Sequence, residues 1–153
     1  MSTKKDFQCA KNACYRLLKV RSRSEKELRD RLEAKGFDNA TIERAVVELS
    51  EIGLIDDEAF ARLWVESRIK RPLGVHRLAS ELALKGINKQ IIVQVLAEYS
   101  NPRQEEEFVR QALAAKMKKL KGLDKKKIKQ KLWGFFLRRG FSKDIVFDVL
   151  NEL

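Results

Sequence analysis

LRDRLEAKGFD, residues 28–38, sets a pattern that returns as LASELALKGIN at residues 78–88 and as LWGFFLRRGFS at residues 132–142. Each copy has two apolar residues four apart, then a basic residue, a glycine, an apolar residue and a small polar residue. The glycines are 50 residues apart between Gly36 and Gly86, and 54 apart between Gly86 and Gly140. A period of this size indicates an array of similar supersecondary units.

Each copy predicts a helix, a glycine corner and a second helix. Apolar residues four apart share one helical face, and a basic residue in the last turn complements the helix dipole. The glycine is placed to adopt the left-handed conformation that ends a helix. We expect the small polar residue to cap the next helix, with an apolar pair forming a hydrophobic staple around it. The caps are Asp38, Asn88 and Ser142, and the staples are Phe37 with Ile42, Ile87 with Ile92, and Phe141 with Val146.

Other helix boundaries carry their own signals. Ser24 and Glu27 have the spacing of a capping box, and Asp56 is expected to cap the helix that follows it. Pro72 interrupts the middle of the chain, and Gly53 is placed to end a helix. The apolar residues expected on the helix after Asp56 are Phe60, Leu63, Trp64 and Ile69.

These signals together predict an all-α protein, a tandem array of three three-helix repeats with about nine helices and no strand. The repeats are expected at residues 1–53, 54–102 and 103–153. A unit of about 50 residues is near the lower size limit for an independent core, so neighbours are expected to share apolar surface. Such sharing predicts an elongated, curved stack.

Composition favours a folded, strongly basic protein. The 153 residues are 44% hydrophobic and 36% charged, with a net charge of +11. The excess is +4 over residues 1–50, +1 over 51–103 and +6 over 104–153. This balance predicts an anionic partner, either nucleic acid or a nucleoprotein, with a membrane surface less favoured.

Cysteine usage and hydropathy predict a cytoplasmic protein that does not enter a membrane. Cys9 and Cys14 lie five apart on an expected helix and therefore point to different faces, which disfavours a disulfide between them. No Cys and His spacing suggests zinc, and no signal peptide or transmembrane run is present.

The sequence offers little support for catalysis. His76 is the single histidine and has no recognisable nucleophile beside it, so an exposed position at a helix start is expected. Asp56 and Asp57 are better explained by capping than by a metal site, and no GxxxxGK[ST] phosphate loop is present. We therefore expect no enzymatic activity, no metal and no cofactor.

Basic residues at helix ends are the best candidates for a binding surface. If the repeats stack regularly, these residues line one face and follow an anionic ridge; the alternative is an ordinary solvated face. The candidates are Arg21, Arg23, Arg68, Lys70, Arg71, Arg77, Lys125, Lys126, Lys127, Lys129, Arg138 and Arg139. Among the aromatic residues, Trp64, Trp133 and Phe136 are expected in cores rather than stacked on bases. Phe135 lies off the Leu132 and Phe136 face, so both interpretations stay open for it.

Several of these stretches resemble the RecX regulatory proteins. The matching stretches are Arg21–Leu28 with Leu32 and Lys35-Gly36, Asp56–Ala61, and Gly74–Leu78 with Glu81-Leu82 and Lys85–Ile87. The resemblance covers nearly the whole chain, with a looser match in the third repeat. It implies a negative regulator that binds the RecA recombinase filament on DNA, blocks its extension or promotes its disassembly, and suppresses ATP hydrolysis, strand exchange and coprotease activity. It thus implies roles in recombination regulation, DNA repair and the SOS response.

Two functional hypotheses therefore stand side by side. The first is a non-enzymatic filament regulator acting as a monomer, with weak, non-specific affinity for single- and double-stranded DNA. The alternative is a helical-repeat DNA-binding protein that acts without RecA, since helix–turn–helix units with basic ends also suit DNA.

Overall fold

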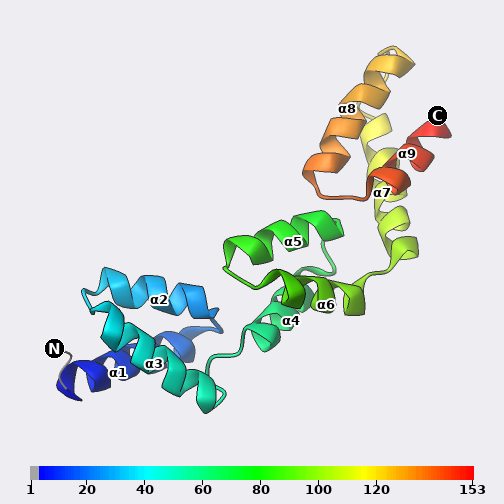
Figure 1. The fold of residues 1–153 in the computed structure, drawn as a ribbon. Coiled ribbons are helices and arrows are strands. Elements are labelled where there is room, and N and C mark those ends of the chain that lie inside the picture. Colours follow the sequence, from blue (N-terminus) through cyan, green and yellow to red (C-terminus); the bar gives the residue numbers. More distant parts are fainter. Residues whose placement is uncertain (1–3) are drawn as a thin grey trace. The chain divides into compact units, whose positions relative to one another are not determined.

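The computed structural model describes residues 4–153, and within that range the chain forms nine α-helices and no strand (Figure 1). This confirms the all-α prediction. The helices are α1 (Lys4–Val20), α2 (Glu25–Ala34), α3 (Asn39–Glu51), α4 (Asp57–Arg68), α5 (Val75–Leu84), α6 (Lys89–Tyr99), α7 (Pro102–Met117), α8 (Lys125–Arg138) and α9 (Lys143–Asn151).

The described chain divides into two compact units. Residues 4–63 and 82–92 form the first unit, and residues 64–81 and 93–153 form the second unit. The first unit contains α1, α2 and α3 complete, and the second contains α7, α8 and α9 complete. The boundaries pass through α4, α5 and α6, so the helices of the expected second repeat contribute residues to both units.

The core of the first unit lies among α1, α2 and α3, which pack against one another (Figure 1). Leu28 and Leu32 of α2 are fully buried, as is Cys14 of α1. Burying a leucine side chain stabilises a fold by about 1.5–3 kcal/mol, so the paired leucines of the repeated pattern anchor α2. The other buried members of this core are Phe7, Ala10, Ala13, Ile42, Ala45, Val46, Leu49 and Ile55.

The core of the second unit lies among α7, α8 and α9, where α9 packs against both other helices. Leu132 and Phe136 of α8 are buried, and the Phe136 ring meets the Phe141 ring edge to face at a centroid distance of 5.8 Å. Trp133 is partly buried against this core, as expected. The remaining buried members are Val109, Ile128, Val146, Val149 and Leu150.

The three glycine corners are confirmed, because Gly36, Gly86 and Gly140 have φ angles of 88°, 77° and 81°. Asp38 caps α3 by accepting from the Thr41 amide at 2.7 Å, and Asn88 caps α6 by accepting from the Gln90 amide at 2.8 Å.

The expected Ser142 cap is only half right. Ser142 occupies the N-cap position of α9, but its side chain makes no capping hydrogen bond. Instead its backbone amide donates to Oε1 of Glu105 on α7, at 2.7 Å. A carboxylate from a neighbouring helix therefore holds this corner within the second unit.

Two other expectations need correction. Ser24 accepts from the Glu27 amide at 3.2 Å, but the reciprocal half of the capping box is wrong, since the Glu27 carboxylate pairs with cationic side chains instead. On α4, Leu63 is 54% exposed, whereas Ala61 and Val65 are buried. The inward face of α4 is formed by Phe60, Ala61 and Val65, so the expectation is confirmed for Phe60 and wrong for Leu63.

In the first unit, the start of α2 meets the end of α5, a contact we call the first junction. The Ser24 hydroxyl donates to the Lys85 carbonyl oxygen at 2.7 Å, which satisfies a fully buried polar side chain. A β-carbon built on Gly86 would lie 2.5 Å from Cβ of Lys26. Gly86 therefore serves two purposes, a left-handed helix end and a close approach to α2.

In the second unit, the start of α5 meets the end of α8 in the same way, a contact we call the second junction. The Gly74 amide donates to the Arg139 carbonyl oxygen at 2.9 Å, and the His76 amide donates to the Gly140 carbonyl oxygen at 3.1 Å. A β-carbon on Gly140 would lie 2.1 Å from the Arg77 amide nitrogen. In the repeat, Gly74 corresponds to Ser24 and Arg139 to Lys85, so one contact recurs with different donors.

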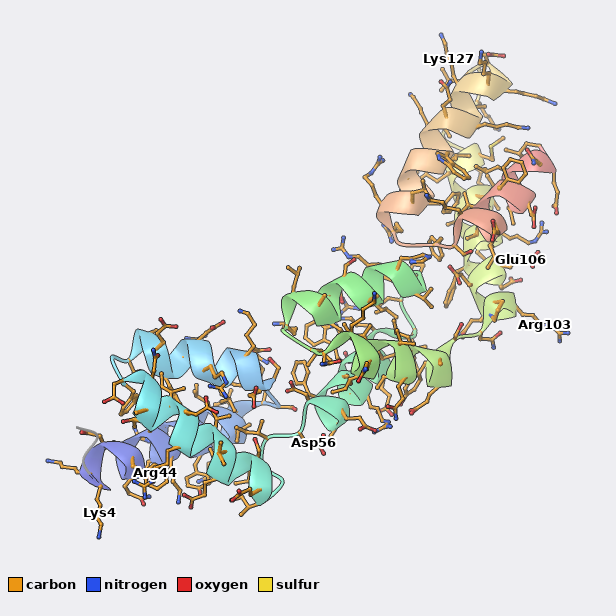
Figure 2. The ribbon with its side chains drawn as sticks, in the orientation of Figure 1. Lys4, Arg44, Asp56, Arg103, Glu106 and Lys127 are labelled. Atoms are coloured by element: carbon orange, nitrogen blue, oxygen red, sulfur yellow. The ribbon has the colours of Figure 1, made fainter. Side chains whose placement is uncertain are left out.

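Asp57 stabilises a helix other than its own. Its Oδ1 accepts from the backbone amide of Glu25, the first residue of α2, at 2.8 Å within the first unit. Burial raises the pKa of this carboxyl group, and the hydrogen bond from Glu25 opposes that rise only in part. Asp56 caps α4 as expected, because its Oδ1 accepts from the Ala59 amide at 3.0 Å (Figure 2).

The junctions predict a difference between two glycines that share a conformation. Gly36 and Gly86 both follow a lysine and both have positive φ, but a β-carbon on Gly36 meets nothing within 4 Å. Gly36→Ala should therefore cost only the left-handed strain of about 1–2 kcal/mol. Gly86→Ala should cost about 1–3 kcal/mol more, because Lys26 must move. Chemical denaturation of both variants measures this difference, and equal losses would contradict the first junction.

A second prediction concerns Asp57. Its raised pKa means that the ionised carboxylate disfavours the folded state above that pKa, and that the penalty disappears as the pH falls through it. Asp57→Asn keeps an acceptor for Glu25 without the buried charge, so it should equal or exceed the parent in melting temperature at pH 7. Asp57→Ala should lose about 0.5–2 kcal/mol. Thermal melts at pH 7 and pH 4 distinguish the two variants.

Candidate functional site

The first group of predicted basic residues surrounds one carboxylate, that of Glu27 on α2. Arg21 donates to Glu27 Oε2, and Lys85 Nζ lies 3.3 Å from Oε1. Nη1 of Arg23 lies 3.8 Å from Oε2. Burial pushes the pKa of Glu27 upward, but Arg21 and Lys85 outweigh it, so the pKa is below its usual value. The first junction thus places three cations around a single negative charge.

Arg23 is largely covered by the protein. Its side chain is 9% exposed, and its Nε donates to the Leu17 carbonyl oxygen at 3.3 Å. Burial, together with the neighbouring Arg21, lowers the pKa of Arg23. The charge of Arg23 therefore interacts mainly with groups of the first unit. The Arg21 side chain is 45% exposed and can also reach a partner.

The second group is organised around Glu81 on α5, within the second unit. Arg68 Nε lies 3.0 Å from Glu81 Oε2, and Arg77 Nε lies 3.4 Å from Oε1. The Trp64 indole donates to Oε2 at 3.0 Å, while the Arg68 guanidinium lies 4.1 Å from the Trp64 ring centroid. Trp64 is therefore half-buried and engaged, and the charge of Arg68 is matched locally.

Lys70 and Arg71 lie in the turn between α4 and α5 and differ from these paired residues. Both are exposed, and neither side chain forms an ion pair within residues 4–153. An exposed cation without a carboxylate keeps its full charge toward solvent. Both residues are therefore available to an anionic partner.

The start of α8 concentrates lysines where a helix least favours them. Lys125, Lys126 and Lys127 occupy its first turn, which contains no acidic residue (Figure 2). Cations near a helix N-terminus interact unfavourably with the dipole, and Asp124 at the N-cap makes no side-chain hydrogen bond. Lys129, one turn further, lines a shallow apolar hollow together with Trp133 and Phe147.

The last group lies beside Phe135 in the second unit, where α7 and α8 border an open groove. Lys116 Nζ lies 4.2 Å and the Arg139 guanidinium 5.1 Å from the Phe135 ring centroid. Lys131 and Arg138 also line or border this groove, and none of these four cations forms an ion pair within residues 4–153. We call it the α7–α8 groove.

Sequence reasoning found Arg138 and Arg139 but missed Lys116 and Lys131. The signal that points to the groove is Gly134, a single glycine inside a helical pattern, which usually has a packing or functional reason. The position of Phe135 off the core stripe was the second signal, and the structure places this ring partly buried at the edge of the second core.

The features considered for catalysis occupy structural positions. His76 is exposed at the start of α5, and Asp56 and Asp57 accept backbone hydrogen bonds. No group of three or more His, Cys, Asp or Glu side chains in residues 4–153 is arranged to hold a metal ion. Cys9 is exposed, and burial raises the pKa of the Cys14 thiol. In the same range, no helix combines the length and hydropathy that crossing a bilayer requires.

Comparison with known families gives a match across all three repeats. Residues 10–49 match the first three-helix domain of RecX, residues 56–96 the second and residues 104–150 the third. The chain belongs to the RecX family. It therefore shares the tandem organisation of three three-helix domains, which the repeated glycine corners predicted.

Individual relatives agree with this assignment. The regulatory protein RecX of Chlorobium phaeobacteroides is 37% identical over 97% of this chain and 95% of its own. The RecX proteins of Mycolicibacterium smegmatis and Amycolatopsis mediterranei are 36% and 33% identical, over 93% and 95% of this chain and 78% and 83% of theirs. The crystal structure of RecX from Lactobacillus salivarius has the same fold, with a TM-score of 0.88 at 22% identity over 99% of this chain and 98% of that one.

The Glu27 cluster yields a prediction about pH. Its depressed pKa means that the carboxylate contributes stability above the unfolded value of about 4.3, and that this contribution is lost as the pH falls through the folded pKa. Glu27→Gln leaves Arg23 without its counter-charge and should cost about 1–3 kcal/mol at pH 7. The difference from the parent should shrink below about pH 4.3. Glu33→Gln, an exposed glutamate on the same helix, is the matched control for urea denaturation.

Proposed function

We propose that this RecX-family chain is a negative regulator of the RecA recombinase, which binds the RecA–DNA filament and blocks its extension or promotes its disassembly. Inhibition of ATP hydrolysis, strand exchange and coprotease activity follows from fewer active filament subunits. The observation that carries the proposal is the match of all three domains to a family of regulatory proteins. The role belongs to recombination regulation, DNA repair and the SOS response, in the cytoplasm.

The distribution of charge supports a nucleoprotein partner. A filament on DNA offers phosphates and protein carboxylates together, and exposed, unpaired cations bind both. Lys70 and Arg71 supply such cations between α4 and α5, and Arg138 and Arg139 supply them at the end of α8. Action through binding alone, as a monomer and without catalysis, suffices for this role.

The alternative is a DNA-binding protein that acts without RecA. The α7–α8 groove and the lysines at the start of α8 favour some direct affinity for DNA. A plain DNA binder that neutralises about six phosphates of a single strand should lose affinity steeply with salt, with a logarithmic slope near −4. A filament regulator should keep inhibiting RecA at salt concentrations that abolish binding to bare DNA.

The test is DNA-dependent ATP hydrolysis by RecA, with the chain titrated in at near-physiological salt. Inhibition at amounts far below that of RecA is expected for action on the filament. Inhibition only when the chain is abundant enough to cover the DNA would indicate masking, and no inhibition would refute the proposal.

A double charge-reversal variant tests whether Arg71 and Arg138 lie on the surface that contacts the RecA–DNA filament. Arg71→Glu combined with Arg138→Glu should raise the concentration for half-inhibition about tenfold, which corresponds to about 1.4 kcal/mol of lost binding. Both side chains are exposed and form no ion pair within the described chain, so the melting temperature should change little. Arg103→Glu, an exposed arginine at the start of α7, is the single-charge control and should inhibit normally (Figure 2). Normal inhibition by the double variant would show that these residues lie outside the contact surface.

A further inference from the structure

Three groups of cations in the structure are held in two different ways. Around Glu27 and around Glu81, arginine and lysine side chains pair with a carboxylate that cancels part of their charge. Beside Phe135, Lys116 and Arg139 are held over an aromatic ring instead. A ring positions a cation through its quadrupole and leaves the full positive charge available.

The α7–α8 groove collects this uncancelled charge in a concave place. Lys116, Lys131 and Arg138 line it, together with Leu120 and Phe135, and no acidic residue does. A cleft lined by charges of one sign concentrates the field and raises the local concentration of counter-ions. The groove therefore offers cations for an anionic ligand and an apolar floor for an uncharged part of the same ligand.

Gly134 keeps this groove open, and packing does not explain its presence. It lies inside α8, where glycine is less favourable than alanine. A β-carbon built there would lie 3.0 Å from Nη1 of Arg138, the far end of a flexible side chain, and apart from the adjoining residues of α8 it would meet no other side chain or backbone within 4 Å. Gly140, by contrast, would bring its β-carbon to 2.1 Å from a backbone nitrogen. The absence of a side chain at position 134 thus serves the groove rather than the fold.

From these observations we infer that the α7–α8 groove binds a segment of single-stranded nucleic acid, with phosphates at Lys116, Lys131 and Arg138 and a base or sugar against Leu120 and Phe135. Positive grooves combined with aromatic side chains are the usual way in which proteins bind single strands. The inference deepens the DNA-contacting part of the proposed function, on which it rests for its biological setting.

The surroundings favour a nucleic acid over an acidic peptide. Exposed lysines continue past the end of α7 into the turn before α8, at Lys118, Lys119 and Lys121. The positive surface is therefore longer than the groove itself. It suits a polymer that carries one negative charge per nucleotide better than a short peptide with a few carboxylates.

The experiment measures fluorescence anisotropy of a labelled oligothymidylate of about twelve nucleotides, titrated with the full chain in the absence of RecA. Gly134→Leu fills the groove with a residue that favours helix, so the melting temperature should stay equal or rise. The dissociation constant should rise at least tenfold. Ala114→Leu, which adds the same side chain at an exposed position of α7 outside the groove, should bind as the parent does.

A charge-neutralising pair gives an independent measurement. Lys131→Gln should reduce the magnitude of the slope of log affinity against log salt by about 0.7, the value for one phosphate contact on a single strand. Lys89→Gln, an exposed lysine at the start of α6 in the first unit, should leave that slope unchanged. Equal slopes for both variants would overturn the assignment of a phosphate to Lys131.

Other outcomes overturn the inference as a whole. One is that Gly134→Leu binds the oligonucleotide with the affinity of the parent. Another is that Gly134→Leu loses as much affinity for a duplex of the same length as for the single strand. A third is that Gly134→Leu loses affinity only for an oligoglutamate peptide. Because RecA is absent, failure here is separate from failure of the proposed function. If the Gly134→Leu variant binds DNA as the parent does and inhibits RecA normally, the groove is not a DNA-binding site, and the proposal of a RecA regulator is unaffected.

Discussion

The rest of the structure depends on the close approach of a glycine corner to the start of another repeat's second helix. At the first junction, Gly86 lies against Lys26 while the Ser24 hydroxyl donates to Lys85. At the second junction, Gly140 lies against Arg77. A side chain at either glycine would both strain the backbone and separate the two helices. The glycine that ends a helix therefore also determines how closely the neighbouring helix can approach. Another residue cannot replace this glycine without a cost in stability.

The two junctions place a basic residue in different surroundings. The residue before each junction glycine is Lys85 or Arg139, and its carbonyl oxygen accepts the hydrogen bond that closes the junction. In the first unit the Lys85 side chain lies beside Glu27 in the first turn of α2, and the two charges are paired. In the second unit the Arg139 side chain lies over Phe135 of α8 instead. One backbone geometry thus yields a structural ion cluster in one place and an accessible cation in another.

Local chemistry made much of the fold predictable. The left-handed glycines, the Asp38 and Asn88 caps and the two core leucines of α2 follow from interactions within a few residues. The misses share a different cause. Glu27 has the spacing of a capping box, yet it pairs with Lys85, which is 58 positions away. Asp57 caps α2 instead of supporting only α4. Contacts between distant residues leave no periodic pattern in the sequence. The position of Lys116 over Phe135 therefore could not be predicted, whereas Arg138 and Arg139 could be predicted as candidate cations from their place at a helix end.

The first turn of α8 has a consequence for how this helix behaves in solution. Three adjacent lysines repel one another there and oppose the helix dipole, and Asp124 at the N-cap makes no capping hydrogen bond. Dissolved salt weakens both effects, with a screening length of about 10 Å at 0.1 M. At low ionic strength this turn should therefore fray and exchange its amide hydrogens faster than the rest of α8, whose later turns bury Leu132 and Phe136. The order of the helix start is thus adjusted by the ions around it, while the order of its buried end is not.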